Sequence, residues 1–243
     1  MSKDDLFWKD NFERDTIPWS NYYSGSNIDA NNSLTNSSER SHHGKYCLKS
    51  TIDKDNSGAT GDAKATVPIP NGITYVHMRA YVQLDHLPAN GGKMRPLSIA
   101  YQITGDGALV YFTLINDGGT LKSGIYYRSF GSFTQLNGTA CELNKWYCIE
   151  LVVHYGTAND GWVKLYKDGK LDVSVSGVDH YRTFSYCVAG NSYSTPNAGA
   201  DTSAYIDCLR IGTSYIGCEP PFWGKRHGAR MGPSGQHGRL YLK

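Results

Sequence analysis

Residues 145–177 alternate apolar and polar side chains with a period of two, the pattern that places successive residues on opposite faces of a β-strand. In the first run one parity is apolar, through Tyr147, Ile149, Leu151, Val153 and Tyr155. Two further runs flank Asp168-Gly169 and keep the pattern, with Val163, Leu165, Leu171, Val173 and Val175 on the apolar side. Asp-Gly tolerates the positive φ angles of a tight hairpin turn. The stretch therefore predicts a strand followed by a hairpin.

Comparable short runs recur along the rest of the chain and are separated by Gly, Asn and Asp, at about residues 43–52, 58–70, 74–87, 97–104, 110–114, 123–130, 185–191 and 203–217. An apolar opening at residues 6–8 predicts an edge strand, and residues 20–44, rich in Asn, Ser and Gly, predict a surface loop. This spacing of strands and turns predicts an all-β fold, a two-sheet antiparallel jelly-roll β-sandwich. We expect one domain over residues 1–219 and a basic, irregular C-terminal extension over residues 220–243.

The charge of the chain is unevenly distributed. The net charge is +2, but residues 220–243 hold five cations and no acid, so residues 1–219 carry −3. A near-neutral body argues against a nucleic-acid binder driven by phosphate contacts. No run of 18 apolar residues is present, so we expect no membrane span.

The N-terminal residues and the cysteines bear on location. MSKDDLFWKD is too polar for a signal peptide, yet the predicted fold suits an extracellular, surface-exposed or virion protein. The six cysteines lack zinc-site spacing, and they are equally compatible with free buried thiols and with one or two disulfides. His42 and His43 fall in the polar loop and are expected to be solvated.

The order of these segments resembles the concanavalin-like (laminin-G-like) jelly-roll superfamily over about residues 6–217. The segments that carry the resemblance are Asp10-Asn11-Phe12-Glu13 with Trp19, Gly44-Lys45-Tyr46-Cys47-Leu48-Lys49, Lys145-Trp146-Tyr147, Gly161 to Gly169, Ile206-Asp207 and Ile211-Gly212. Members include lectins, carbohydrate-binding modules, glucanases, polysaccharide lyases and structural spacers, so the fold leaves function open.

The resemblance also implies a structural Ca²⁺ site. In many such modules, acids of the first and last strands hold the ion together with a backbone carbonyl. The matching positions are Glu13, the carbonyl of Lys45, and Asp207. Calcium prefers six to eight oxygen ligands, and here it would join the two ends of the domain.

The polar parity of the middle strands supplies the candidate ligand-binding residues. If the apolar parity faces the core, the other parity converges on one outer sheet. Flat aromatic rings can stack on the C–H faces of sugars, while Arg, Gln and His bond their hydroxyls. The resulting ligand-binding candidates are His77, Arg79, Tyr81, Gln102, Tyr111, Tyr126, Arg128, Trp162 and Tyr166.

Two enzyme classes of this superfamily can be compared with the sequence. Glucanases resemble one another in an E-x-D-x-x-E strand, which this chain lacks. Alginate-lyase-like members carry Q-I-H and K-x-G-x-Y, and the chain has Gln102-Ile103-Thr104 and Lys122-Ser123-Gly124-Ile125-Tyr126. Thr104 replaces the histidine, and only about twenty residues separate the motifs. The resemblance implies Tyr126 as acid/base with Arg79, Gln102 and His77 as catalytic partners.

These observations favour the binding of a polysaccharide or glycan on the concave sheet. The alternative is a polysaccharide lyase that cleaves a uronate polymer by β-elimination. A third possibility is a structural or adhesive domain of a surface, filament or virion, with the basic tail contacting an assembly partner.

Overall fold

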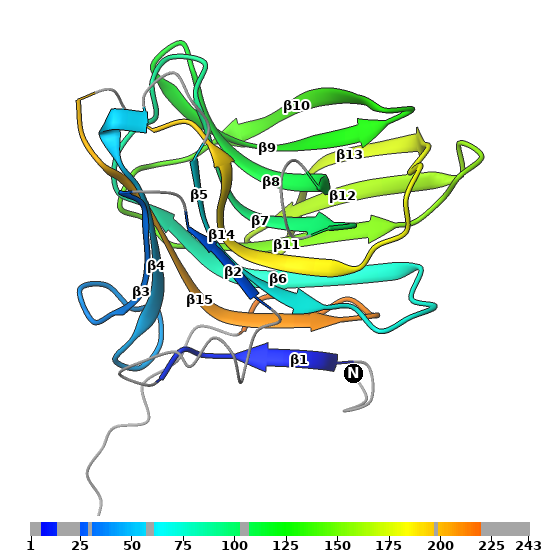
Figure 1. Cartoon of the computed structure of the whole chain (residues 1–243), viewed down its shortest axis with the longest axis horizontal. Helices are drawn as coiled ribbons and strands as arrows, with labels where there is room; N and C mark the ends of the chain where they lie inside the picture. Colours follow the sequence, from blue (N-terminus) through cyan, green and yellow to red (C-terminus); the bar gives the residue numbers. More distant parts are fainter. Residues whose placement is uncertain are drawn as a thin grey trace, which may run out of the picture.

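The structure is a computed structural model that describes residues 6–13, 25–28, 31–56, 61–102, 107–196 and 199–219. The strands in these residues form two antiparallel sheets that pack face to face (Figure 1). The prediction of an all-β, two-sheet antiparallel jelly-roll sandwich is confirmed. No helix in the described part of the chain is long and apolar enough to cross a membrane. The predicted extension over residues 220–243 lies outside the described residues.

Sheet A has the order β13-β12-β11-β6-β15-β4-β3, and β1 also pairs with β15. Its strands are β1 (Leu6–Asp10), β3 (Ser33–Ser37), β4 (Cys47–Ile52), β6 (Tyr75–Leu84), β11 (Tyr147–His154), β12 (Gly161–Lys167), β13 (Lys170–Val178) and β15 (Thr202–Gly212). Strands from both ends of the chain thus lie side by side in one sheet. The first and last strands pair directly, from Leu6 opposite Gly212 to Asp10 opposite Leu209.

Sheet B has the order β10-β9-β8-β7-β14-β5-β2. Its strands are β2 (Gly25–Ile28), β5 (Gly61–Pro68), β7 (Lys93–Ala100), β8 (Ala108–Asp117), β9 (Thr120–Ser129), β10 (Ser132–Ala140) and β14 (Tyr186–Ser194). A short 3₁₀ helix, η2 (Lys54–Asn56), follows β4. The core lies between the sheets and takes side chains from both, including Met78, Leu151 and Ile206 of sheet A and Ile99 and Phe112 of sheet B.

The hairpin predicted within residues 145–177 is present as β11, β12 and β13. Asp168 and Gly169 have φ angles of 51° and 77°, so this turn has the positive φ angles that the Asp-Gly pair predicts. Leu171 is an exception to the predicted apolar face, because it lies next to the turn and is 55% exposed. Glu150 is an exception on the other face, where it is 2% exposed.

The prediction of a loop over residues 20–44 is wrong in part. β2 and β3 lie within it, and they form edge strands of sheet B and sheet A by pairing with β5 and β4. β10 was also not predicted, because its sequence SFTQLNGTA does not alternate cleanly. β10 forms an edge strand of sheet B.

Candidate functional site

The predicted ligand-binding residues lie on two opposite sides of the sandwich. His77, Arg79 and Tyr81 are on β6 of sheet A, whereas Tyr111 and Tyr126 are on β8 and β9 of sheet B. β6 pairs with β11 and β15, so neither β8 nor β9 is its neighbour. The expectation that these residues share one outer face is therefore wrong. Side-chain parity identifies outward-facing residues, but it does not say which strands belong to the same sheet.

The outer face of sheet A is covered beside β6 by the segment that follows β15. Arg79 is 2% exposed; it donates hydrogen bonds to the backbone oxygen of Cys208 at 3.1 Å and to Glu219 Oε1 at 2.9 Å. The Tyr81 hydroxyl donates to the Glu219 backbone oxygen at 3.3 Å. A disulfide between Cys148 and Cys218 fixes the same segment to β11. Arg79 and Tyr81 therefore bind the protein's own chain in this structure.

Glu150 and His77 also help to hold the segment that follows β15 on the outer face of sheet A. The buried Glu150 carboxylate accepts hydrogen bonds from the backbone N–H groups of Ile216, at 2.9 Å, and Gly217, at 2.7 Å. His77 Nδ1 lies 2.8 Å from Glu150 Oε1. A buried carboxylate requires hydrogen-bond donors, and here the backbone N–H groups of the turn over sheet A supply them.

Trp162 and Tyr166 lie farther along the outer face of sheet A, on β12. The Trp162 ring is 5.9 Å from that of Tyr75 and 5.7 Å from that of His154. The Tyr166 ring packs 5.5 Å from that of Tyr215. These rings form two separate aromatic groups, both on the opposite sheet from Tyr126.

On the outer face of sheet B, Tyr126 lies beside two cations that the sequence analysis did not single out. The Arg95 guanidinium is 5.0 Å from the Tyr126 ring centre and 5.1 Å from that of Tyr111. Lys93 Nζ is 4.5 Å from the Tyr126 ring centre. Tyr111 is only 1% exposed, so its ring packs against Tyr126 and is not accessible to a ligand.

The neighbouring edge of the sheet adds a second ring and an amide. Phe133 stacks on Tyr126 with ring centres 4.6 Å apart. Gln135 lies opposite Tyr126 in the β9–β10 register, and its Nε2 donates to Thr113 Oγ1 at 3.1 Å. This contact crosses Gly124, where a Cβ atom would lie 2.8 Å from Gln135 Nε2. Glycine at this position therefore leaves room for the Gln135 amide.

We call this group the sheet-B patch, defined by Lys93, Arg95, Tyr111, Tyr126, Arg128, Phe133 and Gln135. Arg128 belongs to it through Phe133, because its guanidinium lies 5.0 Å from that ring centre. Gln102 follows β7 in the connection to β8 and is exposed. Ile103 and Thr104 of its motif lie outside the described residues.

The electrostatics of the patch favour a negatively charged ligand. Burial lowers the pKa of Lys93, and the positive charge of Arg95 lowers it further. Each cation thus raises the free energy of the other in its charged form. An anion placed between them would offset this repulsion. The arrangement suits a ligand that combines an apolar face with a carboxylate.

The sequence pattern does not identify Lys93, Arg95, Phe133 or Gln135 as candidates, for two reasons. The register between β7 and β8 shifts between Met94 and Leu97, which hides the alternation that would have marked Arg95 as outward-facing. Phe133 and Gln135 share one parity of β10, but this parity mixes apolar and polar residues, so the run does not read as a strand and neither residue stands out.

The predicted calcium ligands come close to one loop, but they contact its N–H groups. Glu13 accepts hydrogen bonds from the backbone N–H of Lys45, at 3.0 Å to each carboxylate oxygen. Asp207 Oδ2 accepts from the N–H groups of His42 and His43, both at 2.9 Å. Both carboxylates thus hold the loop directly. A Ca²⁺ ion bound by Glu13, Asp207 and the Lys45 carbonyl stays a prediction, which a fall in melting temperature on chelation with EGTA would support.

No protein-family model matches the sequence, and no curated protein matches it. Solved structures do resemble the fold. An endo-β-1,4-glucuronan lyase from the fungus Trichoderma reesei is 14% identical with a TM-score of 0.62, over 86% of this chain and 96% of that one. The cellulose-induced protein Cip1 is 15% identical with a TM-score of 0.59, over 87% of this chain and 100% of that one. An alginate lyase from Klebsiella pneumoniae is 10% identical with a TM-score of 0.51, over 72% and 84%. At these identities the likeness shows a shared fold.

Proposed function

We propose that the chain binds an acidic polysaccharide, a polymer that contains uronate residues, on the sheet-B patch. The observation that carries this proposal is the position of Lys93 and Arg95 against the ring of Tyr126. A sugar ring can stack on the aromatic side chains while its carboxylate lies near the two cations. Tyr126 and Arg128 of this patch were predicted from the sequence as ligand-binding residues. The cationic and amide groups that were expected from Arg79 and Gln102 are here supplied by Lys93, Arg95 and Gln135.

Two of the structural neighbours support this ligand class. Their names describe enzymes that act on glucuronan and alginate, both of which are uronate polymers. Cip1, named for its induction by cellulose, shares the fold without being named as an enzyme. The neighbours therefore support a polysaccharide ligand and leave binding and cleavage as separate proposals. The structural or adhesive role stays a prediction.

The second candidate function is cleavage by β-elimination, and the position of Tyr126 beside Arg95 favours it. In this reaction the Tyr126 oxygen takes the proton from C5 of a uronate, the C4–O glycosidic bond breaks, and a C4=C5 double bond forms. The leaving oxygen receives a proton from the same tyrosine. Lys93 and Arg95 would stabilise the negative charge that develops on the carboxylate as C5 loses its proton.

Incubation with polyglucuronate separates the two functions. Binding is measured by calorimetry, and cleavage by the ultraviolet absorbance of the double bond conjugated with the carboxylate. Tyr126→Phe keeps the ring, so it should retain binding within about threefold and abolish any absorbance rise. A wild-type protein that binds without an absorbance rise is a binding protein only. A protein that neither binds nor cleaves polyglucuronate or alginate contradicts both proposals.

A further inference from the structure

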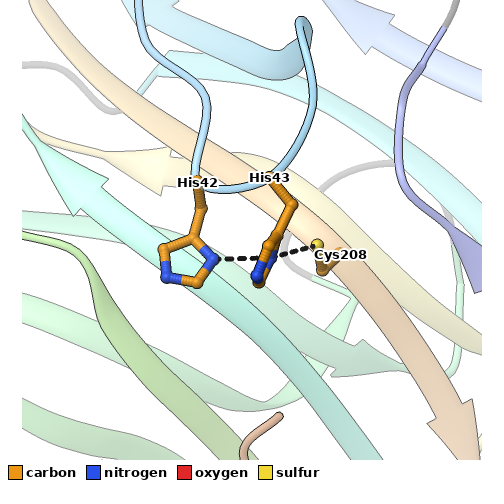
Figure 2. A group of neighbouring side chains, drawn as sticks. All are labelled: His42, His43 and Cys208. Atoms are coloured by element: carbon orange, nitrogen blue, oxygen red, sulfur yellow. Dashed lines mark hydrogen bonds between the residues drawn. The ribbon is translucent and has the colours of Figure 1, made fainter. Parts of the chain in front are cut away.

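The loop between β3 and β4 carries two histidines whose imidazole rings meet a cysteine of β15 (Figure 2). His42 Nδ1 is 2.8 Å from His43 Nδ1, and His43 Nδ1 is 3.2 Å from Cys208 Sγ. The possible ligand atoms of the three residues all lie within 4.8 Å of one another. The sequence places His42 and His43 in a polar loop, where solvated side chains were expected, yet both are partly buried in the structure.

A bulge in β15 brings Cys208 to this position. The pairing of β15 with β6 shifts between Asp207 and Arg210, and Cys208 has a φ of 53°, which is unusual for a residue other than glycine. Ile206 and Leu209 on either side belong to the core. The extra residue therefore allows Asp207 and Cys208 both to face outward. Strained backbone of this kind persists where its surroundings hold it in place, and it concentrates at functional sites.

Asp207 fixes the loop that faces the cysteine. Its carboxylate is buried and accepts the backbone N–H groups of His42 and His43, so both residues are anchored by their main chain. The backbone of the loop is thus held by contacts that do not involve the imidazoles. The His42 ring also stacks on Tyr81 with ring centres 3.6 Å apart, which limits its rotation. The three side chains are thus held together by the fold before any ligand arrives.

Two imidazole nitrogens and one thiolate are the ligand types that Zn²⁺ prefers. Tetrahedral Zn²⁺, with bonds of about 2.0–2.1 Å to nitrogen and about 2.3 Å to sulfur, would separate the two nitrogens by about 3.3 Å and nitrogen from sulfur by about 3.6 Å. In the structure the two nitrogens are about 0.5 Å closer than this, His43 Nδ1 and Cys208 Sγ are about 0.4 Å closer, and the ligand atoms of His42 and Cys208 lie within 4.8 Å of each other. Small side-chain rotations would therefore admit the ion.

A fourth ligand position is also available. Glu219 Oε1 is bound by Arg79 and Arg210, at 2.9 and 3.3 Å, while Oε2 lies 3.7 Å from His43 Nδ1. The three candidate ligands and Glu219 line a cavity of about 550 Å³. Either this carboxylate or a water molecule from the cavity could complete a tetrahedron.

We propose that His42, His43 and Cys208 form a Zn²⁺-binding site that joins the β3–β4 loop to β15. Binding replaces the Cys208 S–H bond with an S–Zn bond and releases the proton to solvent, so affinity rises with pH. None of these three side chains is a ligand in the predicted calcium site. The calcium prediction takes its ligands from Glu13, Asp207 and the Lys45 carbonyl.

Cobalt(II) is a suitable probe, because its thiolate complexes absorb strongly in the near ultraviolet and its tetrahedral complexes absorb in the visible. The full chain is titrated with Co²⁺ without thiol reductants, so that the Cys148–Cys218 disulfide stays closed. We expect a saturable 1:1 spectrum that Zn²⁺ displaces, together with a Zn²⁺-dependent rise in melting temperature. Cys208→Ser should lose the thiolate band, and His43→Ala should weaken Co²⁺ binding by at least about tenfold.

His86→Ala and Cys141→Ser are the matched controls, and both should bind Co²⁺ like the wild-type protein. If Cys208→Ser does not fold, His42→Ala and His43→Ala decide the question, because the backbone N–H groups that hold the loop remain. A wild-type protein without a thiolate–cobalt band contradicts the proposal. So does a band that persists unchanged in the histidine variants, or a protein whose melting temperature rises with Ca²⁺ but not with Zn²⁺.

Discussion

Arg79 donates a hydrogen bond of 2.9 Å to the carboxylate of Glu219 and so binds the segment after β15 onto the outer face of sheet A. Arg210 approaches the same carboxylate oxygen at 3.3 Å. With Glu150 and the Cys148–Cys218 disulfide, these contacts hold residues 213–219 over β6 and β11. His77, Arg79 and Tyr81 of β6 are accordingly part of a structural clamp, and the sheet-B patch is the proposed binding face.

The disulfide should contribute strongly to this clamp. It joins residues 70 positions apart, and closing a loop of that length lowers the entropy of the unfolded chain enough to stabilise the fold by about 4 kcal/mol. We expect the double variant Cys148→Ser/Cys218→Ser to lose about that free energy of unfolding, measured by urea denaturation. Titration of the denatured, unreduced wild-type protein should find four free thiols, from Cys47, Cys141, Cys187 and Cys208. Six thiols would show that the bond is absent.

His180 should make the fold less stable in acid. It is fully buried, and burial lowers its pKa from 6.5 to about 4. Because the folded state favours the neutral ring, its contribution is complete above pH 6.5 and is lost as pH falls towards 4. We expect a loss of about 2 kcal/mol between about pH 7 and about pH 5.

Urea denaturation at both pH values checks this expectation for His180. His180→Leu should reduce the decline by most of that amount, and the exposed control His86→Leu should leave it unchanged. An equally steep decline in His180→Leu would show that other groups cause it. His42, whose pKa burial also lowers to about 4, should account for part of the remaining slope.

Gly124 should be intolerant of a side chain. A Cβ atom there would lie 2.6 Å from the Leu136 backbone oxygen and 2.8 Å from Gln135 Nε2. Gly124→Ala should therefore displace β10, lower stability by about 1–3 kcal/mol, and weaken polysaccharide binding by moving the Gln135 amide. Thermal denaturation and calorimetric titration measure the two effects, and the exposed β10 variant Thr134→Ala serves as control. Wild-type affinity in Gly124→Ala would remove Gln135 from the proposed site.

The fold was more accessible from the sequence than the site was. The hairpin around Asp168 could be predicted because alternation and turn chemistry are local properties. The side of the sandwich on which Arg79 or Tyr126 lies depends on strand order, which is set by contacts between distant segments. The cluster at His42 could not be predicted from spacing either. It depends on a bulge at Cys208, which follows His43 by 165 residues in the chain.

Polysaccharide binding on the sheet-B patch is tested most directly by the affinity for polyglucuronate of the wild-type protein and of Lys93→Glu, measured by calorimetry at fixed ionic strength. Lys93 is only partly buried, so the variant should fold, and it places a negative charge beside Tyr126. We predict at least about a tenfold loss of affinity in Lys93→Glu and no change in the exposed control Lys170→Glu. Equal affinity of Lys93→Glu and the wild-type protein, or a loss seen instead in Trp162→Ala on sheet A, would contradict it.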